Sequence, residues 1–344
     1  MFLRRSRRAR ANLTHFVLEI TQDCNEDCIY CYNVWKHSKY PKGILSIVEW
    51  KKIITALRKQ SRVSRLSISG GEPLLYLELL DLVDFIRENG ISVNLLTNGS
   101  LLSEKIAHEL VKRRISIFEI PFIASTPELH CEIKRRDDYE AVMNGMANVY
   151  REKGKIVQTF VATTRNLYAL QEVVELGIVL GSAGLMFNRI NPACPEHISL
   201  MPTRAELMKA LEFLNVFSKK NHYPVSSSIP IQPCIIDMKS YRKISHGYCP
   251  SGNEQSYYTV DSLGNVRMCN HSPTIIGNLL TDDLQDIIES SSFVSEFKRT
   301  LPSACISCEK AQECRGGCKA AAQVCFGSLD QNDPFFKTEY VSRC

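Results

Sequence analysis

Short apolar runs alternate with amphipathic stretches from about residue 14 to residue 220. A run of about five apolar residues between turn residues is typical of a buried strand, whereas apolar positions three or four apart are typical of a helix. Two predicted helices begin with a capping box, since Ser46 precedes Glu49 by three residues and Thr203 precedes Glu206 likewise. The predicted strands are 16–20, 65–69, 91–96, 115–123, 156–162 and 185–190, and the predicted helices are 46–59, 77–88, 104–112, 138–152, 170–180 and 203–220.

Six strand–helix units in succession predict an α/β fold with a parallel sheet, closed or nearly closed, and helices on its outer face. Eight such units make a complete (β/α)8 barrel. Six therefore predict a partial (β/α)6 barrel. In this architecture the functional residues lie at the carboxyl ends of the strands.

The pattern changes after about residue 221. Residues 226–233 contain three serines and two prolines, which is typical of a linker. Beyond them we expect short helices and a β-hairpin over 257–268, with a turn at 261–264. Because cysteines are dense there, we expect metal to stabilise this part as much as an apolar core does. The predicted organisation is a disordered basic arm (1–13), the barrel (14–225) and a small cysteine-rich domain (226–344).

The net charge of +5 comes from 42 Lys and Arg against 37 Asp and Glu. Five arginines lie within the first ten residues, so the rest of the chain is formally neutral. A neutral body argues against a broad nucleic-acid or membrane surface, and we expect neither kind of partner.

The cysteine content bears on the cellular compartment. No stretch approaches the ~18 apolar residues of a membrane span, and the basic start lacks the ~7–15 apolar residues of a secretion signal. Fourteen cysteines in such a chain indicate metal ligands or redox groups in a reducing compartment. We therefore expect the protein in the cytoplasm.

Three cysteines follow the first predicted strand, at Cys24, Cys28 and Cys31. Thiolates are soft ligands, and this density indicates a metal site. A [4Fe–4S] cluster normally takes four thiolates, so three would leave one iron open to an outside ligand. A Cys28–Cys31 redox pair and a zinc site are alternatives that the spacing leaves open.

The Cys24-x3-Cys28-x2-Cys31 spacing, with Tyr30 before the third cysteine, resembles the signature of the radical SAM enzymes. The segment 69–73 (Ser-Gly-Gly-Glu-Pro) resembles the glycine-rich loop of the same family, and the resemblance covers roughly residues 14–200. It implies that the open iron binds S-adenosylmethionine, which is reductively cleaved to a 5′-deoxyadenosyl radical. The residues implied to contact the cofactor are Tyr30, Ser69, Gly70, Gly71, Glu72, Pro73, Asn98, Ser125 and Arg189.

Two of these assignments have a structural alternative. Asn98 belongs to a Thr-Asn-Gly segment that is also typical of a simple turn. Arg189 lies in a predicted buried strand, where it needs a partner such as a carboxylate. That carboxylate belongs either to the cofactor or to a structural ion pair.

Nine cysteines lie between Cys234 and Cys344, and their spacing resembles the SPASM domain of many radical SAM enzymes. That resemblance implies two auxiliary [4Fe–4S] clusters. The first would be held by Cys249, Cys269 and Cys318, and the second by Cys305, Cys308 and Cys314. One or two zinc sites are the alternative that the paired spacing allows.

The fourth ligands of both clusters are less clearly indicated. Relatives often carry the last cysteine after an Asp-Pro near the C-terminus, but here Asp333-Pro334 is followed by two phenylalanines. We therefore expect Cys325 to complete the second cluster, with Cys344 as the alternative. Cys234 is the candidate for the first, which would otherwise have an open iron that could bind substrate.

Two further residues, Cys194 and Glu119, are candidates for a catalytic role. Cys194 lies just past the sixth strand, where a thiol could donate a hydrogen atom to a substrate radical as in related peptide epimerases; the alternative is an inert loop cysteine. Glu119, in the fourth strand, is a candidate acid or base, or a paired core residue. Cys131 adjoins His130, but we expect it to be a buried small residue.

Together the resemblances imply an enzyme that modifies a ribosomally made peptide by crosslinking, oxidation or epimerisation. The implied partners are the peptide and an external flavodoxin- or ferredoxin-like electron donor. A small-molecule or porphyrin-type radical SAM oxidoreductase is one alternative. A non-catalytic iron–sulfur or zinc-binding protein is the other.

Overall fold

The computed structural model describes residues 10–37, 39–251 and 256–336, so most of the basic arm and Cys344 lie outside the described residues. Six parallel strands lie side by side in chain order at the centre of one open sheet. This arrangement confirms the predicted α/β partial barrel. The strands are β1 (His15–Glu19), β2 (Arg65–Ser69), β3 (Ser92–Leu96), β4 (Ile117–Pro121), β5 (Ile156–Ala162) and β6 (Ser182–Arg189).

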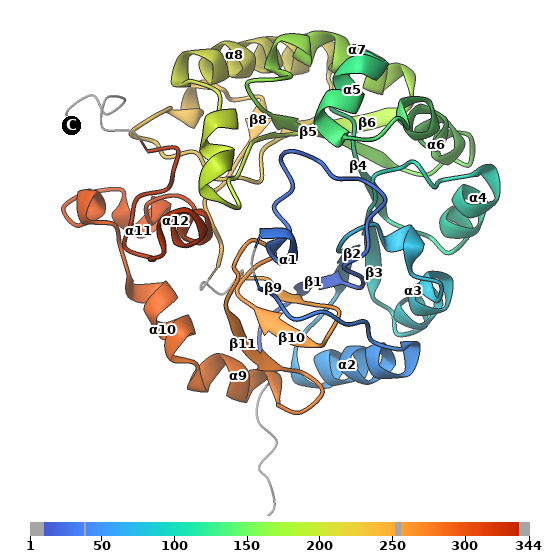
Figure 1. Ribbon diagram of the computed structural model, residues 1–344, viewed down its shortest axis with the longest axis vertical. Coiled ribbons are helices and arrows are strands. Elements are labelled where there is room, and N and C mark those ends of the chain that lie inside the picture. Colours follow the sequence, from blue (N-terminus) through green and yellow to red (C-terminus); the bar gives the residue numbers. More distant parts are fainter. Residues whose placement is uncertain (1–9, 38, 252–255, 337–344) are drawn as a thin grey trace, which may run out of the picture.

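Six helices pack on the outer face of these strands and form the ring seen in Figure 1. Both predicted capping boxes are present, at Ser46 with Glu49 and at Thr203 with Glu206. Each helix buries an apolar stripe against the sheet, and Trp50 is fully buried. The helices are α2 (Ile47–Gln60), α3 (Leu79–Glu88), α4 (Glu104–Lys112), α6 (Tyr139–Arg151), α7 (Leu170–Val179) and α8 (Arg204–Asn221).

One helix beside the barrel opening was not predicted. This is α5 (Pro127–Lys134), and its start is encoded locally: the Thr126 side chain accepts a hydrogen bond from the Leu129 amide, and Pro127 occupies the first turn. The shorter elements are α1 (Val34–His37) and the 3-10 turns η1 (Pro73–Leu75), η2 (Leu167–Ala169), η3 (Pro195–Leu200), η4 (Met238–Ser240) and η5 (Ser303–Cys305).

The central sheet continues on both sides into the C-terminal third of the chain. β7 (Val225–Ser226) and β8 (Ile244–Ser245) extend it in parallel beyond β6. On the other side, β9 (Tyr258–Val260) pairs in parallel with β1, and β10 (Asn265–Arg267) and β11 (Ile275–Asn278) follow as antiparallel strands. The predicted hairpin over 257–268 is confirmed as β9–β10. It does not form a separate sheet, because β9 pairs with the edge of β1.

The last four helices close the side of the ring between α2 and α8 (Figure 1). They are α9 (Leu284–Ser290), α10 (Ser292–Arg299), α11 (Ala311–Cys314) and α12 (Lys319–Phe326). All of them are short, as the sequence predicted, and Cys305, Cys308 and Cys318 lie in the turns that connect them.

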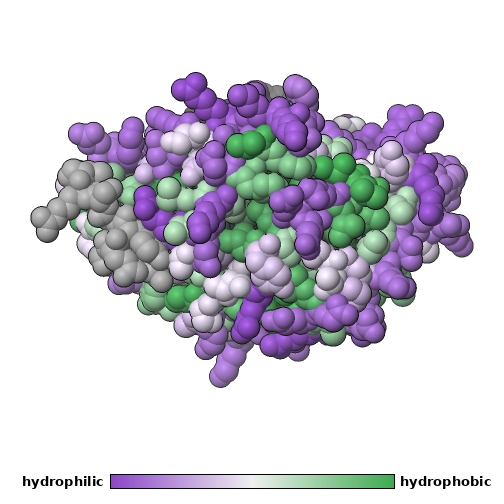
Figure 2. All heavy atoms as spheres, turned by 90° about the horizontal axis from the view of Figure 1, so that it is seen from above, coloured by the Kyte–Doolittle hydropathy of each residue, from purple (hydrophilic) through white to green (hydrophobic). Residues whose placement is uncertain are grey.

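Figure 2 shows a face on which apolar side chains gather across the middle, between charged ones. Val179 of α7 and Val216 of α8 are among the exposed apolar residues of the chain. Among the described helices, none combines the length and the apolar character needed to cross a bilayer.

Candidate functional site

The loop after β1 carries the first three cysteines and lies over the carboxyl ends of the central strands. Its backbone is held from two sides. The amides of Gly71 and Glu72 donate to the carbonyls of Thr21 and Asp23, at 2.8 and 2.7 Å. On the opposite side, the Ile29 amide donates to a carbonyl near the end of α5, that of Ile133, at 2.9 Å. We call residues 20–31 the cysteine loop.

Glycine is required at two positions of the adjoining segment 69–73. A Cβ atom at Gly71 would lie 2.0 Å from the Asp23 carbonyl oxygen, and one at Gly70 would lie 2.4 Å from that of Thr21. Gly70 also has a φ of +129°, which L side chains rarely adopt. The two glycines therefore let the cysteine loop lie directly against β2. Their predicted contact with the cofactor remains a prediction.

Glu72 connects this segment to the residues that follow β3. Its side chain is fully buried and accepts three hydrogen bonds, from the Thr97 hydroxyl at 2.6 Å, the Asn98 amide at 2.7 Å and the Leu74 amide at 3.0 Å. Burial raises the pKa of Glu72 to about 7, although the three donors oppose the shift. Glu72 thus positions Thr97 and Asn98. Its predicted contact with the cofactor remains a prediction.

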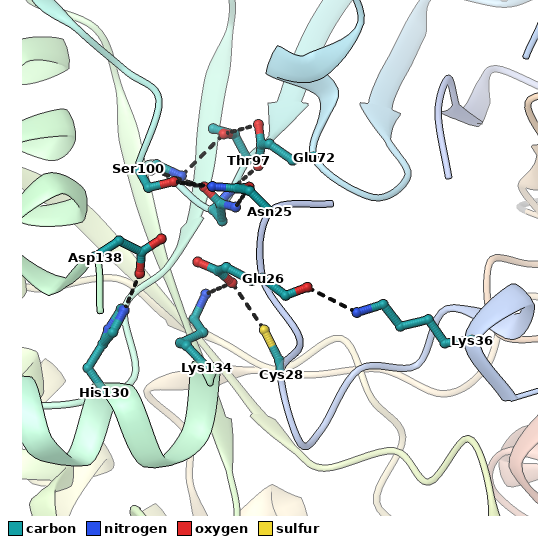
Figure 3. Close-up of polar contacts among 12 residues, drawn as sticks. Asn25, Glu26, Cys28, Lys36, Glu72, Thr97, Ser100, His130, Lys134 and Asp138 are labelled. Carbon is teal, nitrogen blue, oxygen red and sulfur yellow. Dashed lines mark hydrogen bonds and ion pairs between the residues drawn. The ribbon is translucent and has the colours of Figure 1, made fainter. Parts of the chain in front are cut away.

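Asn98 in turn binds the cysteine loop. Its side-chain amide donates to the Asn25 side-chain oxygen at 2.7 Å, and the Asn25 amide donates to the Ser100 hydroxyl at 2.9 Å. Figure 3 shows these groups together with Glu72 and Thr97. The Thr-Asn-Gly segment therefore anchors the loop that carries the cysteines. The predicted contact of Asn98 with the cofactor remains a prediction.

A buried polar network that the sequence did not predict lies on the other side of the cysteine loop. Glu26 and Lys134 form an ion pair at 2.7 Å, with side chains only 2% and 1% exposed. The Cys28 thiol donates to the same Glu26 oxygen at 3.1 Å. His130 and Asp138, 2.8 Å apart, extend the network (Figure 3). The signal that could have revealed it is the acidic residue inside the cysteine motif.

The remaining candidates near this loop occupy different environments. Tyr30 is buried in the apolar core. Ser125 is half-buried in the loop after β4. Glu119 is half-buried in β4, and burial raises its pKa to about 7 against the opposing charge of Arg65. Cys131 is exposed, so the expectation of a buried residue was wrong. The roles predicted for Tyr30, Ser125 and Glu119 remain predictions.

Arg189 lies at the end of β6 and is 1% exposed. Its guanidinium lies 2.5 Å from the Asp333 carboxylate and donates twice to the Pro230 carbonyl, at 3.1 and 3.0 Å. These contacts correspond to the ion pair that the sequence left as the alternative. The predicted contact with the cofactor remains a prediction.

The C-terminal cysteines fall into three groups. The first contains Cys249, Cys269 and Cys318; Cys269 and Cys318 belong to one buried cluster, against which the half-buried Tyr257 packs. The Asn191 amide donates to the Cys318 sulfur at 3.3 Å. The ring centroids of Tyr32 and His271 lie 5.9 Å apart. Tyr32 follows Cys31 and His271 is two residues after Cys269, so this contact joins the cysteine loop to the first group.

The other two groups differ from the predicted partition. Cys305, Cys308 and Cys314 line a cavity of about 390 Å³, and the cysteine that lines it with them is Cys234. Cys325, the expected ligand, instead lies beside Cys194 and donates to its carbonyl oxygen at 3.5 Å. Helical geometry explains this position of Cys325. It is seven residues after Cys318, so it lies about 10 Å farther along α12.

The separation of the thiols argues against single zinc ions. Tetrahedral zinc with Zn–S bonds of about 2.3 Å brings its sulfurs within about 4 Å of one another. Within residues 10–37, 39–251 and 256–336, the group of three metal-ligating side chains whose atoms all lie within 4.8 Å is Glu26, His130 and Asp138, with no cysteine among them. The larger iron–sulfur clusters are the better fit to the cysteine groups.

A second cavity, of about 740 Å³, opens between the cysteine loop and η3. Cys28 and Cys194 both line it, so Cys194 lies at the predicted rim. Its role as a hydrogen-atom donor remains a prediction. The charged side chains that line this cavity are Asp27, Lys36, Glu132, Arg135, Arg165 and Glu196.

Comparison with protein families gives two matches. Residues 18–176 match the Radical SAM superfamily, and residues 249–319 match an iron–sulfur cluster-binding domain, SPASM. The first match contains the cysteine loop and Glu72. The second contains Cys249, Cys269, Cys305, Cys308, Cys314 and Cys318, whereas Cys234 lies before it.

Relatives among curated proteins agree with these matches. The mycofactocin maturase MftC of Mycobacterium tuberculosis is 26% identical over 325 residues, which cover 92% of this chain and 81% of that protein. A protein of Methanocaldococcus jannaschii, MJ0907, is 26% identical over 280 residues, covering 80% of this chain and 90% of its own length.

Solved structures share the fold. Streptococcus suis SuiB bound to its precursor peptide SuiA has a TM-score of 0.73 and 15% identity, covering 94% of this chain and 75% of SuiB. The protein anSMEcpe with bound AdoMet has a TM-score of 0.74 and 18% identity, covering 94% of this chain and 90% of the other.

Proposed function

Since the chain is a radical SAM enzyme with a C-terminal SPASM region, we propose that it modifies a ribosomally made peptide by abstracting one of its hydrogen atoms. A maturase among its relatives and structural neighbours solved with bound peptides support this substrate class. We place the enzyme in the cytoplasm, with an external flavodoxin- or ferredoxin-like protein as its electron donor.

The observation that carries the proposal is the 740 Å³ cavity at the cysteine loop. It reaches Cys28, and both acidic and basic side chains line it. A peptide offers hydrogen-bond donors, acceptors and charges along its whole length, so a mixed lining of this kind suits it. A small anion would meet repulsion from the acidic side chains of this lining, and an apolar molecule would leave its charged groups without partners.

The cysteine loop is the part of the chain to which we assign radical generation. S-adenosylmethionine bound at a [4Fe–4S] cluster on Cys24, Cys28 and Cys31 supplies a 5′-deoxyadenosyl radical. The fit of the loop to such a cluster rests on its chemistry: three thiols are presented on a backbone that is held rigidly from both sides.

The remaining residues of the site position this loop. Gly70 and Gly71 allow it to lie against β2, while Glu72 orients Thr97 and Asn98, which binds Asn25. The Glu26 carboxylate, paired with the Lys134 ammonium, accepts the hydrogen bond of the Cys28 thiol and so orients this side chain. These contacts keep the geometry of the loop fixed when a cofactor binds.

The proposal is tested with anaerobically reconstituted enzyme, S-adenosylmethionine, a reductant and peptides encoded beside the gene. We expect release of 5′-deoxyadenosine and a mass change in one peptide. Cys28→Ala should abolish both, whereas Cys131→Ala, an exposed cysteine outside the site, should leave both unchanged.

Two outcomes would contradict different parts of the proposal. Release of 5′-deoxyadenosine with no change in any of the peptides, but with modification of a small molecule, would overturn the peptide substrate. Full turnover by Cys28→Ala would overturn the assignment of the cysteine loop.

A further inference from the structure

Four cysteines from two distant parts of the chain surround one cavity in the C-terminal third. Cys305 and Cys308 lie in and after η5, Cys314 ends α11, and Cys234 comes from the segment between β7 and β8. All four side chains line the same cavity of about 390 Å³, so one bound group can contact all of them.

Cys234 is held in place from both sides of its turn. The Pro230 carbonyl accepts two hydrogen bonds from Arg189 of β6, and the Ile235 carbonyl accepts one from Arg204 of α8 at 2.6 Å. Ile235 itself is 1% exposed. The barrel thus fixes the backbone that presents this cysteine to the cavity.

A buried amide in the same lining has no partner. Gln232 is 2% exposed, lines the cavity, and makes no hydrogen bond through its side-chain nitrogen or oxygen. Leaving a buried amide unpaired costs about 1–3 kcal/mol. An acceptor in the cavity, such as a sulfide or thiolate, would remove that cost for the nitrogen.

The backbone around Cys314 also supplies donors to sulfur. Gly316 and Gly317 have φ values of +82° and +88°, and their amides donate hydrogen bonds to the Cys314 sulfur. A Cβ atom at Gly316 would lie 2.7 Å from the Pro302 side chain and 3.6 Å from the Cys305 sulfur. Hydrogen bonds to sulfur are typical of iron–sulfur sites, where they tune the reduction potential.

We propose that Cys234, and not Cys325, is the fourth thiolate ligand of the iron–sulfur cluster held by Cys305, Cys308 and Cys314. The inference depends on the proposed function in one respect, namely that the bound group is an iron–sulfur cluster. The bond from Cys234 links that cluster covalently to the segment that leaves the barrel. It also leaves the group of Cys249, Cys269 and Cys318 with three cysteines.

The first test uses the wild-type chain, so it does not depend on the folding of a variant. Cysteines are alkylated before and after removal of iron by a chelator, and the labelled sites are read by mass spectrometry. Cys234 should be labelled at least about tenfold more slowly in the iron-loaded form, together with Cys305, Cys308 and Cys314. The exposed Cys131 should be labelled equally in both forms.

The second test isolates the auxiliary clusters by combining each variant with Cys24→Ala, Cys28→Ala and Cys31→Ala. Cys234→Ser should shift the electron paramagnetic resonance signal of one reduced cluster, or remove about four irons per chain. Cys325→Ser is the matched control and should keep both the signal and the iron. Circular dichroism confirms that each variant is folded.

The opposite pattern would overturn the assignment. Iron-dependent protection of Cys325 in place of Cys234, or a changed signal in Cys325→Ser but not in Cys234→Ser, assigns the ligand to α12. A chain that shows the expected protection but releases no 5′-deoxyadenosine contradicts the proposed function alone and leaves the ligand assignment standing.

Discussion

At the scale of single residues, the cysteine loop depends on the absence of a side chain at Gly71. The nearest atoms to a Cβ there are backbone atoms of Asp23 and Gln22, which cannot move without moving the loop itself. A flexible side chain could rotate away from such a clash, whereas a backbone carbonyl cannot. The position is therefore constrained by packing before any cofactor is considered.

Gly71→Ala should displace the cysteine loop. We expect reconstituted protein to lose most of the iron of the N-terminal site while keeping that of the C-terminal groups, because those lie on other segments. Gly247→Ala is the control, since a Cβ atom there meets nothing within 4 Å. Iron analysis and electron paramagnetic resonance measure the effect, and an unchanged N-terminal signal would contradict this explanation.

Glu119 gives a pH-dependent prediction at the same scale. Burial raises its pKa from 4.5 to about 7, so the folded state keeps a proton that the unfolded state loses above pH 4.5. The free energy of unfolding should therefore fall as the pH rises from 4.5 to 7, by at most about 3 kcal/mol from this residue.

Urea denaturation of the wild type and of Glu119→Gln across this pH range tests that prediction. In Glu119→Gln, the free energy of unfolding should not show the fall that Glu119 causes between pH 4.5 and 7. Glu175→Gln, on the outer helix α7, is a control with an exposed carboxylate that should leave the profile unchanged. Parallel curves for the wild type and Glu119→Gln would show that Glu119 titrates normally.

At the scale of elements, Glu72 joins three turns that come from different strand–helix units. Its carboxylate binds the hydroxyl and an amide after β3 as well as an amide of η1, while the neighbouring backbone binds the cysteine loop. One buried acid thus fixes the relative positions of the segments that follow β1, β2 and β3. This arrangement explains how residues of separate units form one site.

Thr97→Val removes the hydroxyl that donates to the Glu72 carboxylate. The Oε1 atom of Glu72 then accepts one hydrogen bond, from the Leu74 amide. We expect a loss of about 1–3 kcal/mol in the free energy of unfolding, because the buried carboxylate loses a strong hydrogen bond. Weaker binding of S-adenosylmethionine to the reconstituted enzyme should accompany it. Thr164→Val, at an exposed threonine, is the control.

The regular elements were predictable from the sequence because their signals are local. The capping boxes at Ser46 and Thr203 mark helix starts, and the strand at 156–162 has the predicted bounds. The cysteine motif likewise identified the site. The acidic residue in the cysteine motif was a signal for the network of Glu26, but its partner Lys134 was not predictable, because it lies on a helix more than 100 residues away.

The grouping of the C-terminal cysteines depends on tertiary contacts in the same way. The predicted set placed Cys325 with Cys314, whereas the structure places Cys325 beside Cys194, and Arg204 and Arg189 hold the segment of Cys234 near the cavity. The ligand assignments themselves remain predictions.

At the scale of the whole molecule, two buried ion pairs connect the barrel to the C-terminal third. Glu19 at the end of β1 binds Arg267 of β10, and Arg189 at the end of β6 binds Asp333. The Asp333 carboxylate also accepts a hydrogen bond from the Cys318 amide at 2.8 Å. The barrel and the cysteine groups should therefore unfold together.

Asp333→Asn tests this connection, because it leaves the Arg189 guanidinium buried without a countercharge. Breaking one side of a buried pair costs about 3–5 kcal/mol, whereas replacing both partners by apolar residues costs much less. We expect a large loss of stability in Asp333→Asn and a partial recovery in Arg189→Met/Asp333→Leu. Glu104→Gln, which breaks the exposed pair with Arg151, should change stability by less than about 1 kcal/mol.

Hydrogen exchange provides the decisive measurement for that connection. In Asp333→Asn, faster exchange should appear both at residues 228–236 and around Cys318, because Arg189 and Asp333 bind these segments directly. Exchange that increases only around Cys318 would mean that residues 228–236, which Arg189 of the barrel holds, do not unfold together with the segment around Cys318. In that case the two parts would be separate cooperative units, and the position of Cys234 would not depend on Asp333.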